Sequence, residues 1–273
     1  MKTIGVFDSG VGGLSVLKAL LAEMPQTRYV YLADGAHAPY GERDPRLVAE
    51  RAHRITQDLR ESFGIDALVV ACNTATALAI EGLRVEHPEW PIVGVEPALK
   101  PAAALTRTGH VGVMATRGTI ESERLARLRQ RLEAAADKPL HFSLQACDGL
   151  AHAIERDDRP AIDALCRRYW DALCAQDRAG AAIDTLVLGC THYLFAADVL
   201  QALAGPAVTL VETGVPVARR TRAVLGIGTE AAGTLPPPWP PSVTLMSTGD
   251  PAPLAQAARR WLGLQVPGRH FPC

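Results

Sequence analysis

Two cysteines occupy equivalent positions in two nearly identical stretches of the sequence. Residues 65–74 carry Cys72, and residues 183–192 carry Cys190. Each stretch is a short apolar run rich in β-branched residues, followed by a thiol and then by hydroxyl or amide side chains, which is typical of a buried parallel strand. We therefore predict two matched thiols, each at the carboxyl end of a strand, that act across a shared cleft.

A thiol in this position can act as an acid or a base. Ligands collect at the carboxyl ends of parallel strands, close to the N-termini of the following helices. Such a helix end and polar neighbours lower the pKa of a thiol from about 8.5 towards roughly 3.5 to 7.5, as we expect for Cys72 and Cys190. The other cysteines are interpreted as small buried hydrophobic residues: Cys147, Cys166, Cys174 and Cys273.

Further polar side chains follow predicted strands: Asp8, Ser9, Asp34, Asn73, Thr74, Thr116, Thr191 and His192. Asp8 is suited to bind an ammonium group, whereas Ser9 is equally open to interpretation as a helix N-cap. His192 can hold or protonate a polar group beside Cys190, although a lone histidine is as often structural. Glu155, taken by itself, reads as a solvated helix carboxylate.

The glycine loop at residues 10–13 has features of a dinucleotide-binding motif, since it opens a helix after the first strand and Asp34 ends the second. Ser15, however, stands where that motif requires Gly or Ala, and Asp8 would place a negative charge close to the pyrophosphate. The sequence therefore favours a small ligand with an ammonium group.

Composition and spacing argue against several other partners and cofactors. The 273 residues are 48% hydrophobic and carry a formal net charge of -1, so we expect no bulk attraction to nucleic acid or membrane. The chain reaches Asp8 before any secretory apolar region and has no membrane-spanning run, which predicts a cytoplasmic protein. No C-x-x-C occurs, Cys190 and His192 lack zinc-ligand spacing, and the four lysines lie outside any motif typical of a pyridoxal phosphate site. We expect activity without metal or cofactor.

The elements that must position these residues repeat along the chain. The strand, loop and helix pattern of residues 3–24 restarts at residues 110–116, and the tail after the proline-rich residues 236–241 has a strand and a helix of its own. The predicted fold is α/β, with two similar doubly wound parallel-sheet lobes related by pseudo-two-fold symmetry and the site in the cleft between them. The predicted lobes are residues 1–96 plus 209–273, with Cys72, and residues 97–208, with Cys190.

These motifs resemble the glutamate racemase family, whose cofactor-independent enzymes supply D-glutamate for bacterial peptidoglycan. The matching segments are residues 8–14, 39–41, 71–76, 189–193 and 247–250. The resemblance implies glutamate as substrate and a homodimer, with Cys72 and Cys190 as catalytic acid/bases assisted by Asp8, His192 and Glu155. It also implies a set of substrate-binding residues: Asp8, Ser9, Tyr40, Gly41, Asn73, Thr74, Thr191 and His192.

The sequence departs from that family's pattern at some positions. Gly35 and His37 stand where Thr and Arg are frequent, Leu125 where Tyr is common, and Leu194 where Pro is usual. Residues 212–214 replace an Asp-Ser-Gly segment. None of these changes touches a thiol, so we expect differences in substrate contacts and interfaces and an unchanged chemistry.

Racemisation at an amino-acid α-carbon needs a base on one face and an acid on the other, and two thiols on opposite walls meet this need. By resemblance, Cys72 acts on D-glutamate and Cys190 on L-glutamate. Three alternatives stay open: an aspartate racemase or other cysteine-pair racemase, a hydrolase that uses Cys190 and His192, and a two-lobed amino-acid-binding module without turnover. The hydrolase leaves Cys72 and its repeated context unexplained.

Overall fold

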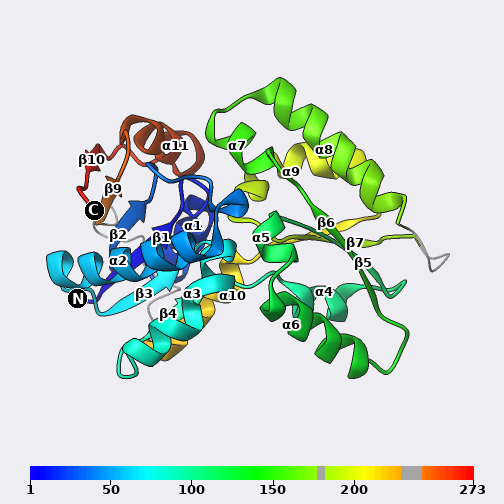
Figure 1. Cartoon of the computed structure of the whole chain (residues 1–273), viewed down its shortest axis with the longest axis horizontal. Coiled ribbons are helices and arrows are strands. Elements are labelled where there is room, and N and C mark those ends of the chain that lie inside the picture. Colours follow the sequence, from blue (N-terminus) through cyan, green and yellow to red (C-terminus); the bar gives the residue numbers. More distant parts are fainter. Residues whose placement is uncertain (177–181, 229–241) are drawn as a thin grey trace.

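The strands form two separate parallel sheets in the computed structural model, which describes residues 1–176, 182–228 and 242–273 (Figure 1). The first sheet has the order β10-β9-β2-β1-β3-β4 and the second the order β6-β5-β7-β8. The strands of the first sheet are β1 Thr3–Asp8, β2 Arg28–Ala33, β3 Ala67–Val70, β4 Ile92–Gly94, β9 Val243–Ser247 and β10 Gly268–His270; those of the second are β5 His110–Ala115, β6 His141–Ala146, β7 Thr185–Leu188 and β8 Thr209–Val211.

Helices cover both faces of each sheet and complete two lobes, which lie side by side (Figure 1). The first lobe surrounds the six-stranded sheet and the second lobe the four-stranded sheet. The helices are α1 Leu14–Glu23, α2 Pro45–Phe63, α3 Asn73–Glu86, α4 Leu99–Leu105, α5 Arg117–Ile120, α6 Glu123–Ala134, α7 Leu150–Glu155, α8 Arg159–Cys174, α9 Ala197–Ala204, α10 Gly214–Val224 and α11 Ala252–Leu262, with short 3-10 helices η1 Tyr40–Glu42 and η2 Thr191–Ala196. The described residues contain no helix that combines the length and the apolar character needed to cross a bilayer.

The repeat in the sequence is a repeat in topology. The order β2-β1-β3-β4 of the first lobe has its counterpart in β6-β5-β7-β8 of the second. In register, Phe7 pairs with Val70 and Met114 pairs with Leu188, so β3 and β7 occupy the same place beside their central strands. The structure confirms the predicted α/β class with two similar parallel-sheet lobes, and it gives Cys72 and Cys190 equivalent positions, each just after its strand.

Alternating side chains of these strands build a core on either face of each sheet. Ile4 and Val6 of β1 join one cluster, whereas Phe7 joins the cluster on the opposite face. In the second lobe, Leu186 and Val187 divide in the same way. Because both faces are covered, the strands read as continuous apolar runs, as expected for parallel sheets between helices.

The ends of α2 show why the helices begin and end where they do. Asp44 accepts a hydrogen bond from the backbone N–H of Arg46 at 2.8 Å, and Pro45 is the first helical residue. Gly64 ends the helix in the left-handed conformation, at φ 55°, which glycine adopts without a steric cost. This helix packs on α3, which begins immediately after Cys72.

The predicted lobe boundary at residue 209 needs one correction. Thr209–Val211 forms β8, which pairs with β7 in the second sheet, so these residues lie with the second lobe. A three-residue strand with only one buried position has little pattern to assign it to either sheet. By contrast, β9 of the tail pairs with β2 in the first sheet. The predicted extended connection at residues 236–241 lies outside the described residues.

Candidate active site

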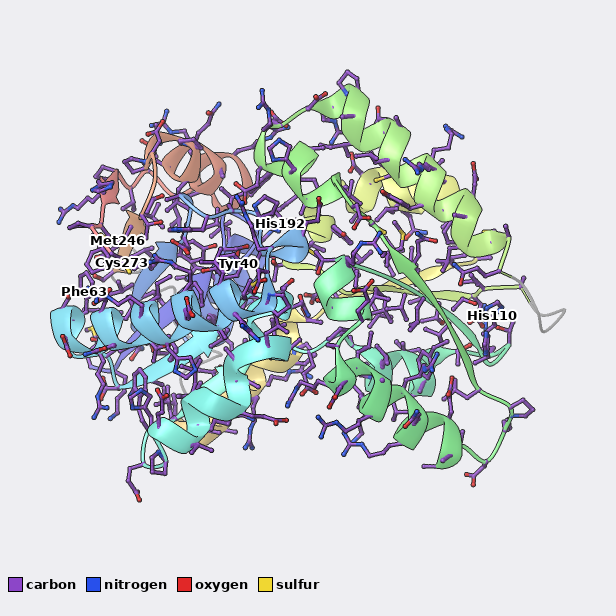
Figure 2. All side chains as sticks on the ribbon, viewed as in Figure 1. Tyr40, Phe63, His110, His192, Met246 and Cys273 are labelled. Atoms are coloured by element: carbon purple, nitrogen blue, oxygen red, sulfur yellow. The ribbon has the colours of Figure 1, made fainter. Side chains whose placement is uncertain are left out.

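Both repeated thiols line one narrow cavity between the lobes. Cys72 is 5% exposed and Cys190 is 7% exposed, and each follows the carboxyl end of its strand. Residues from both lobes, most of them polar, line the cavity: Ser9, Pro39, Tyr40, Gly41, Cys72, Asn73, Thr74, Thr116, Ala151, Cys190, Thr191 and His192. Figure 2 shows His192 and Tyr40 near the middle of the molecule, whereas Phe63 and His110 lie towards its two ends.

The Cys72 thiol is the N-cap of α3. Its Sγ atom accepts a hydrogen bond from the Ala75 N–H at 3.4 Å and lies 3.9 Å from Oγ of Ser9. Burial, and after it the nearby Asp8 carboxylate, raises the pKa of this thiol to about 12, and the hydrogen bond from Ala75 offsets only part of this rise. The expected lowering of the thiol pKa by the helix N-terminus is therefore wrong for Cys72, since burial and a negative neighbour outweigh it.

Asp8 is fully buried where the two lobes meet. Its Oδ1 atom accepts a hydrogen bond from the Gly10 N–H at 2.8 Å, and its Oδ2 atom accepts one from the Thr191 hydroxyl at 3.2 Å. Burial raises the pKa of the carboxyl to about 6, although His192 lowers it in part. Ser9 does not cap α1, which begins after Gly13 without a side-chain cap; its hydroxyl lines the cavity beside Cys72.

Cys190, His192 and Glu155 form a chain of contacts on the opposite wall. Nδ1 of His192 lies 3.6 Å from Sγ of Cys190, and its Nε2 lies 2.6 Å from Oε1 of Glu155. Burial opposes a charge on His192, but the contacts with Cys190 and Glu155 outweigh burial and raise the pKa of the imidazole well above its usual value. A protonated imidazole at this position places a positive charge beside the Cys190 sulfur.

Glu155 is more than the solvated helix carboxylate that its own surroundings in the sequence indicate. It also accepts a hydrogen bond from the Val11 N–H of the first lobe at 2.7 Å. The glycine loop leaves room for this contact, because a Cβ atom at Gly10 would collide with the Glu155 carboxylate, and one at Gly12 would collide with the His192 ring. Gly10 and Gly12 therefore allow Glu155 and His192 of the second lobe to approach the loop closely.

The first turn of α3 presents polar groups to the cavity. Both polar atoms of the buried Asn73 amide lack a hydrogen-bond partner among the described residues, although buried amides are normally paired. Oγ1 of Thr74 lies 2.9 Å from Oγ1 of Thr116, which follows β5 in the second lobe. Thr116 follows a predicted strand, but its pairing with Thr74 depends on how the lobes meet, which no local pattern reveals.

Tyr40 and Gly41 reach the cavity from η1. The Tyr40 hydroxyl donates a hydrogen bond to Oδ2 of the buried Asp34 at 2.6 Å, so the hydroxyl is already engaged and the side chain contributes a wall. Burial of Asp34 is outweighed by hydrogen bonds from Arg51, Thr248 and Tyr40, which lower the pKa of its carboxyl. A Cβ atom at Gly41 would lie 2.7 Å from Thr116 side-chain carbons, so glycine permits contact between the lobes here.

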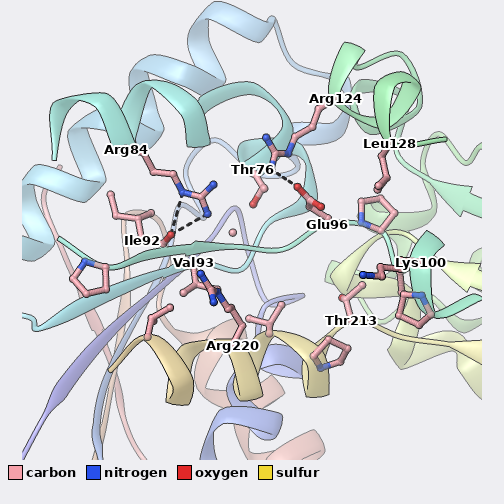
Figure 3. A pocket seen from close by; sticks show the side chains of 18 of the residues that line it. Thr76, Arg84, Ile92, Val93, Glu96, Lys100, Arg124, Leu128, Thr213 and Arg220 are labelled. Atoms are coloured by element: carbon pink, nitrogen blue, oxygen red, sulfur yellow. Dashed lines mark hydrogen bonds and ion pairs between the residues drawn. The ribbon is translucent and has the colours of Figure 1, made fainter. Parts of the chain in front are cut away.

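A larger cavity of about 700 Å³ lies where the chain passes from β4 to α4, between α3, α6 and α10 (Figure 3). Arg84 donates hydrogen bonds to the Ile92 carbonyl at 3.2 and 3.1 Å, and Arg124 pairs with Glu96 and with Glu81. Its lining contains no thiol. Acid/base chemistry by the two cysteines therefore belongs to the smaller cavity.

The chain resembles proteins of known family along nearly its whole length. Residues 5–223 match the family model "Asp/Glu/Hydantoin racemase". The glutamate racemase of Ralstonia pickettii (strain 12J) is 45% identical over 263 residues, which cover 95% of this chain and 88% of that protein. The glutamate racemase of Pseudomonas syringae pv. tomato is 47% identical over 224 residues, covering 81% of this chain and 78% of that protein.

Solved structures of glutamate racemases are also similar to this chain. The crystal structure of glutamate racemase isoform RacE1 from Bacillus anthracis has a TM-score of 0.83 at 30% identity, and the match covers 99% of this chain and 98% of that one. The structure of Escherichia coli glutamate racemase in complex with L-glutamate and the activator UDP-MurNAc-ala has a TM-score of 0.81 at 29% identity, covering 99% and 98%.

Proposed function

The chain belongs to the Asp/Glu/hydantoin racemase family, and within it we infer that the protein is a glutamate racemase, an isomerase that interconverts L- and D-glutamate. The D-glutamate serves peptidoglycan synthesis, as in the glutamate racemase family. The observation that carries the inference is the pair of thiols, Cys72 and Cys190, at equivalent places in two lobes and on the lining of one cavity.

We propose that each thiol serves one face of the substrate. One thiolate removes the proton from the α-carbon, and the opposite thiol returns a proton to the other face, which inverts the configuration. The roles exchange in the reverse direction. Positioned acid and base groups contribute typically 10²- to 10⁴-fold to a rate, so electrostatic stabilisation of the carbanion must supply much of the remainder.

The two thiols have neighbours of opposite charge, so we propose that each is deprotonated in a different way. Beside Cys190, the imidazole of His192 with its raised pKa offers a positive charge. Beside Cys72, the Asp8 carboxylate opposes the thiolate. The ammonium group of bound glutamate would offset the charge of Asp8, and an opposite charge close by lowers the pKa of a thiol. We therefore propose that substrate binding itself prepares Cys72 for proton abstraction.

The substrate carboxylates are proposed to bind the polar groups at the first turn of α3 and the start of η2. The unpartnered amide of Asn73 can donate to a carboxylate oxygen, and Thr74 offers a hydroxyl group on the same turn. Thr191 is proposed to bind from the opposite lobe, once its hydroxyl exchanges Asp8 for the substrate. Donors held in place before reaction stabilise the negative charge that develops as the proton leaves. Ser9, Tyr40 and Gly41 are proposed to shape the remaining wall.

We also propose that the first lobe comprises residues 1–96 and 212–273, and the second lobe residues 97–211. The pairing of β9 with β2 and of β8 with β7 supports this division. A cytoplasmic location and a homodimer remain proposals from the sequence and the family resemblance. Light scattering on the purified protein tests the dimer.

Exchange of the α-proton in heavy water tests the proposed function. L- or D-glutamate incubated with the dialysed, chelator-treated protein should lose its α-proton signal in NMR spectra while circular dichroism falls towards zero. Retention of the α-proton would contradict a racemase and favour a binding module or a hydrolase. Faster exchange with aspartate than with glutamate would change the substrate and keep the chemistry.

A further inference from the structure

The C-terminal helix α11 reaches from the first lobe to the second through two adjacent residues. Trp261 stacks on Phe195 of η2, with ring centroids 3.6 Å apart and ring planes 7° apart. Its neighbour Arg260 pairs with Asp157, which follows α7. Figure 1 shows α11 next to α7 where the two lobes meet. The helix itself is anchored in the first lobe, where Leu254 and Ala258 are buried in the core that also contains residues of β1.

These two contacts lie close to the two members of the His192–Glu155 pair. Phe195 belongs to the same 3-10 helix as His192. Asp157 lies two residues beyond Glu155, the last residue of α7. Two adjacent residues of α11 thus contact the chain close to His192 and to Glu155, whose side chains meet at 2.6 Å.

Local hydrogen bonding in both segments, η2 and α7, is limited, so tertiary packing must hold them. The 3-10 helix η2 has no side-chain N-cap hydrogen bond, and 3-10 hydrogen bonds have poorer geometry than those of an α-helix. The helix α7 has only six residues and begins at Gly149 without a side-chain cap. Short helices are held mainly by tertiary packing. The Cys72 side differs, since its thiol caps the 14-residue helix α3 within the first lobe.

We propose that Trp261 is a positioning residue for the Cys190 half of the site: its stack on Phe195 keeps His192 in contact with Cys190 and Glu155. The proposal rests on the racemase function proposed above. Loss of the stack should slow proton transfer at Cys190 and leave proton transfer at Cys72 nearly unchanged. A displacement of about 1 Å at a reacting group can cost about 10²-fold in rate.

Primary isotope effects separate the two proton transfers. With α-deuterated L- or D-glutamate, the enantiomer whose proton transfer is more fully rate-limiting gives the larger effect. In Trp261→Ala we expect kcat to fall by about tenfold or more. We also expect the isotope effect to rise for the enantiomer that Cys190→Ser also affects, and to fall for the other. Trp261→Phe, which keeps an aromatic ring for the stack, should restore the wild-type ratio of the two isotope effects.

Trp90→Ala is the matched control. Trp90 is also partly buried, and it packs at the far side of the first lobe, where its Nε1 donates a hydrogen bond to the Ile65 carbonyl. This variant should lose stability and keep the wild-type ratio of isotope effects. An unchanged ratio in folded Trp261→Ala, or equal changes for both enantiomers, would overturn the proposal.

A second variant covers the case in which Trp261→Ala does not fold. Arg260→Gln removes an ion pair whose side chains are 46% and 50% exposed, which costs little stability. It should shift the isotope effects in the same sense and to a smaller extent; no shift would count against positioning by α11. Absence of racemisation in the wild type would instead refute the proposed function itself.

Discussion

Thr191 of the second lobe donates a hydrogen bond to Asp8 of the first lobe, across 3.2 Å. Asp8 is fully buried, and its other oxygen accepts a hydrogen bond from the loop before α1. This contact joins the two lobes beside Thr191, which lines the cavity. It also places a titrating carboxyl group between the lobes, which makes the stability of the folded protein depend on pH.

We expect Asp8→Asn to change how stability varies with pH. Burial raises the pKa of Asp8 from 3.8 to about 6, so between these values the folded state binds more protons than the unfolded state. The wild type therefore loses stability as the pH rises through this window, by up to about 3 kcal/mol for a shift of about two pKa units. The variant should lack this loss, as measured by urea unfolding at several pH values.

Asp184→Asn provides the control of opposite sign. Hydrogen bonds from Thr106 and from the backbone of Arg107 and Thr108 outweigh burial and lower the pKa of Asp184 to about 2. The stabilisation by Asp184 is present above the unfolded pKa of about 4 and is lost as the pH falls towards 2. Parallel pH profiles for the two variants would contradict the assignment for Asp8.

The two thiols should differ in the enantiomer that they serve. Replacing a thiol by the far less acidic hydroxyl slows abstraction by that group and makes its step more fully rate-limiting. Cys72→Ser should show the larger primary isotope effect with α-deuterated D-glutamate, and Cys190→Ser the larger effect with the L form. Equal effects for both enantiomers in both variants would refute the two-base assignment, even if the protein racemises glutamate.

Asn73→Ala should weaken substrate binding without loss of stability. The buried amide of Asn73 has no partner among the described residues, so its removal deletes no hydrogen bond to any of them. A hydrogen bond to a charged group contributes about 1.5 to 3 kcal/mol, which predicts a rise in KM of about 10- to 150-fold.

Thr76→Val is the control one turn further along α3. Thr76 donates to the Val70 carbonyl and accepts from the Val95 N–H, both at 3.1 Å. This variant should lose about 1 to 3 kcal/mol of unfolding free energy with little change in KM. If instead Asn73→Ala is the variant that loses stability while KM stays constant, Asn73 has a structural role.

Tyr40→Phe tests whether the Tyr40 hydroxyl binds substrate. This hydroxyl donates to the buried carboxylate of Asp34, and loss of a hydrogen bond to a charged group costs about 1.5 to 3 kcal/mol of stability. We expect such a loss, seen in thermal unfolding, with little change in KM. Tyr29→Phe, whose hydroxyl donates to neutral carbonyls of Leu20 and Met24, should lose less. A large rise in KM with unchanged stability would assign the hydroxyl to substrate.

The thiols and their strands were predictable from the sequence because the signal is local. A strand of four buried residues precedes each thiol: Ala67–Val70 before Cys72 and Thr185–Leu188 before Cys190. A parallel strand that is covered on both faces has this continuous apolar pattern. The repeat then indicated that both thiols belong to one site.

The contacts between lobes were not predictable in this way. Val11 and Glu155 meet across the cleft although they lie far apart in the chain. Thr74 and Thr116 likewise come from different lobes, and no local pattern indicates that they meet. The raised pKa of Cys72 likewise follows from the depth of its burial and from Asp8, which a helix N-terminus in the sequence does not reveal. Thr209–Val211 was misplaced because three residues are too few to show which sheet they join.

The return of the tail to the first sheet also sets an order of events during synthesis on the ribosome. β9 and β10 occupy the edge beside β2, yet they are made after every strand of the second lobe. We therefore expect the emerging chain to complete the second sheet while β2 still exposes an unpaired edge, which is prone to mispairing. Chains stalled before Val243 should resist proteolysis within residues 97–211 and be cleaved within the first lobe; uniform resistance would show that β2 needs no late partner.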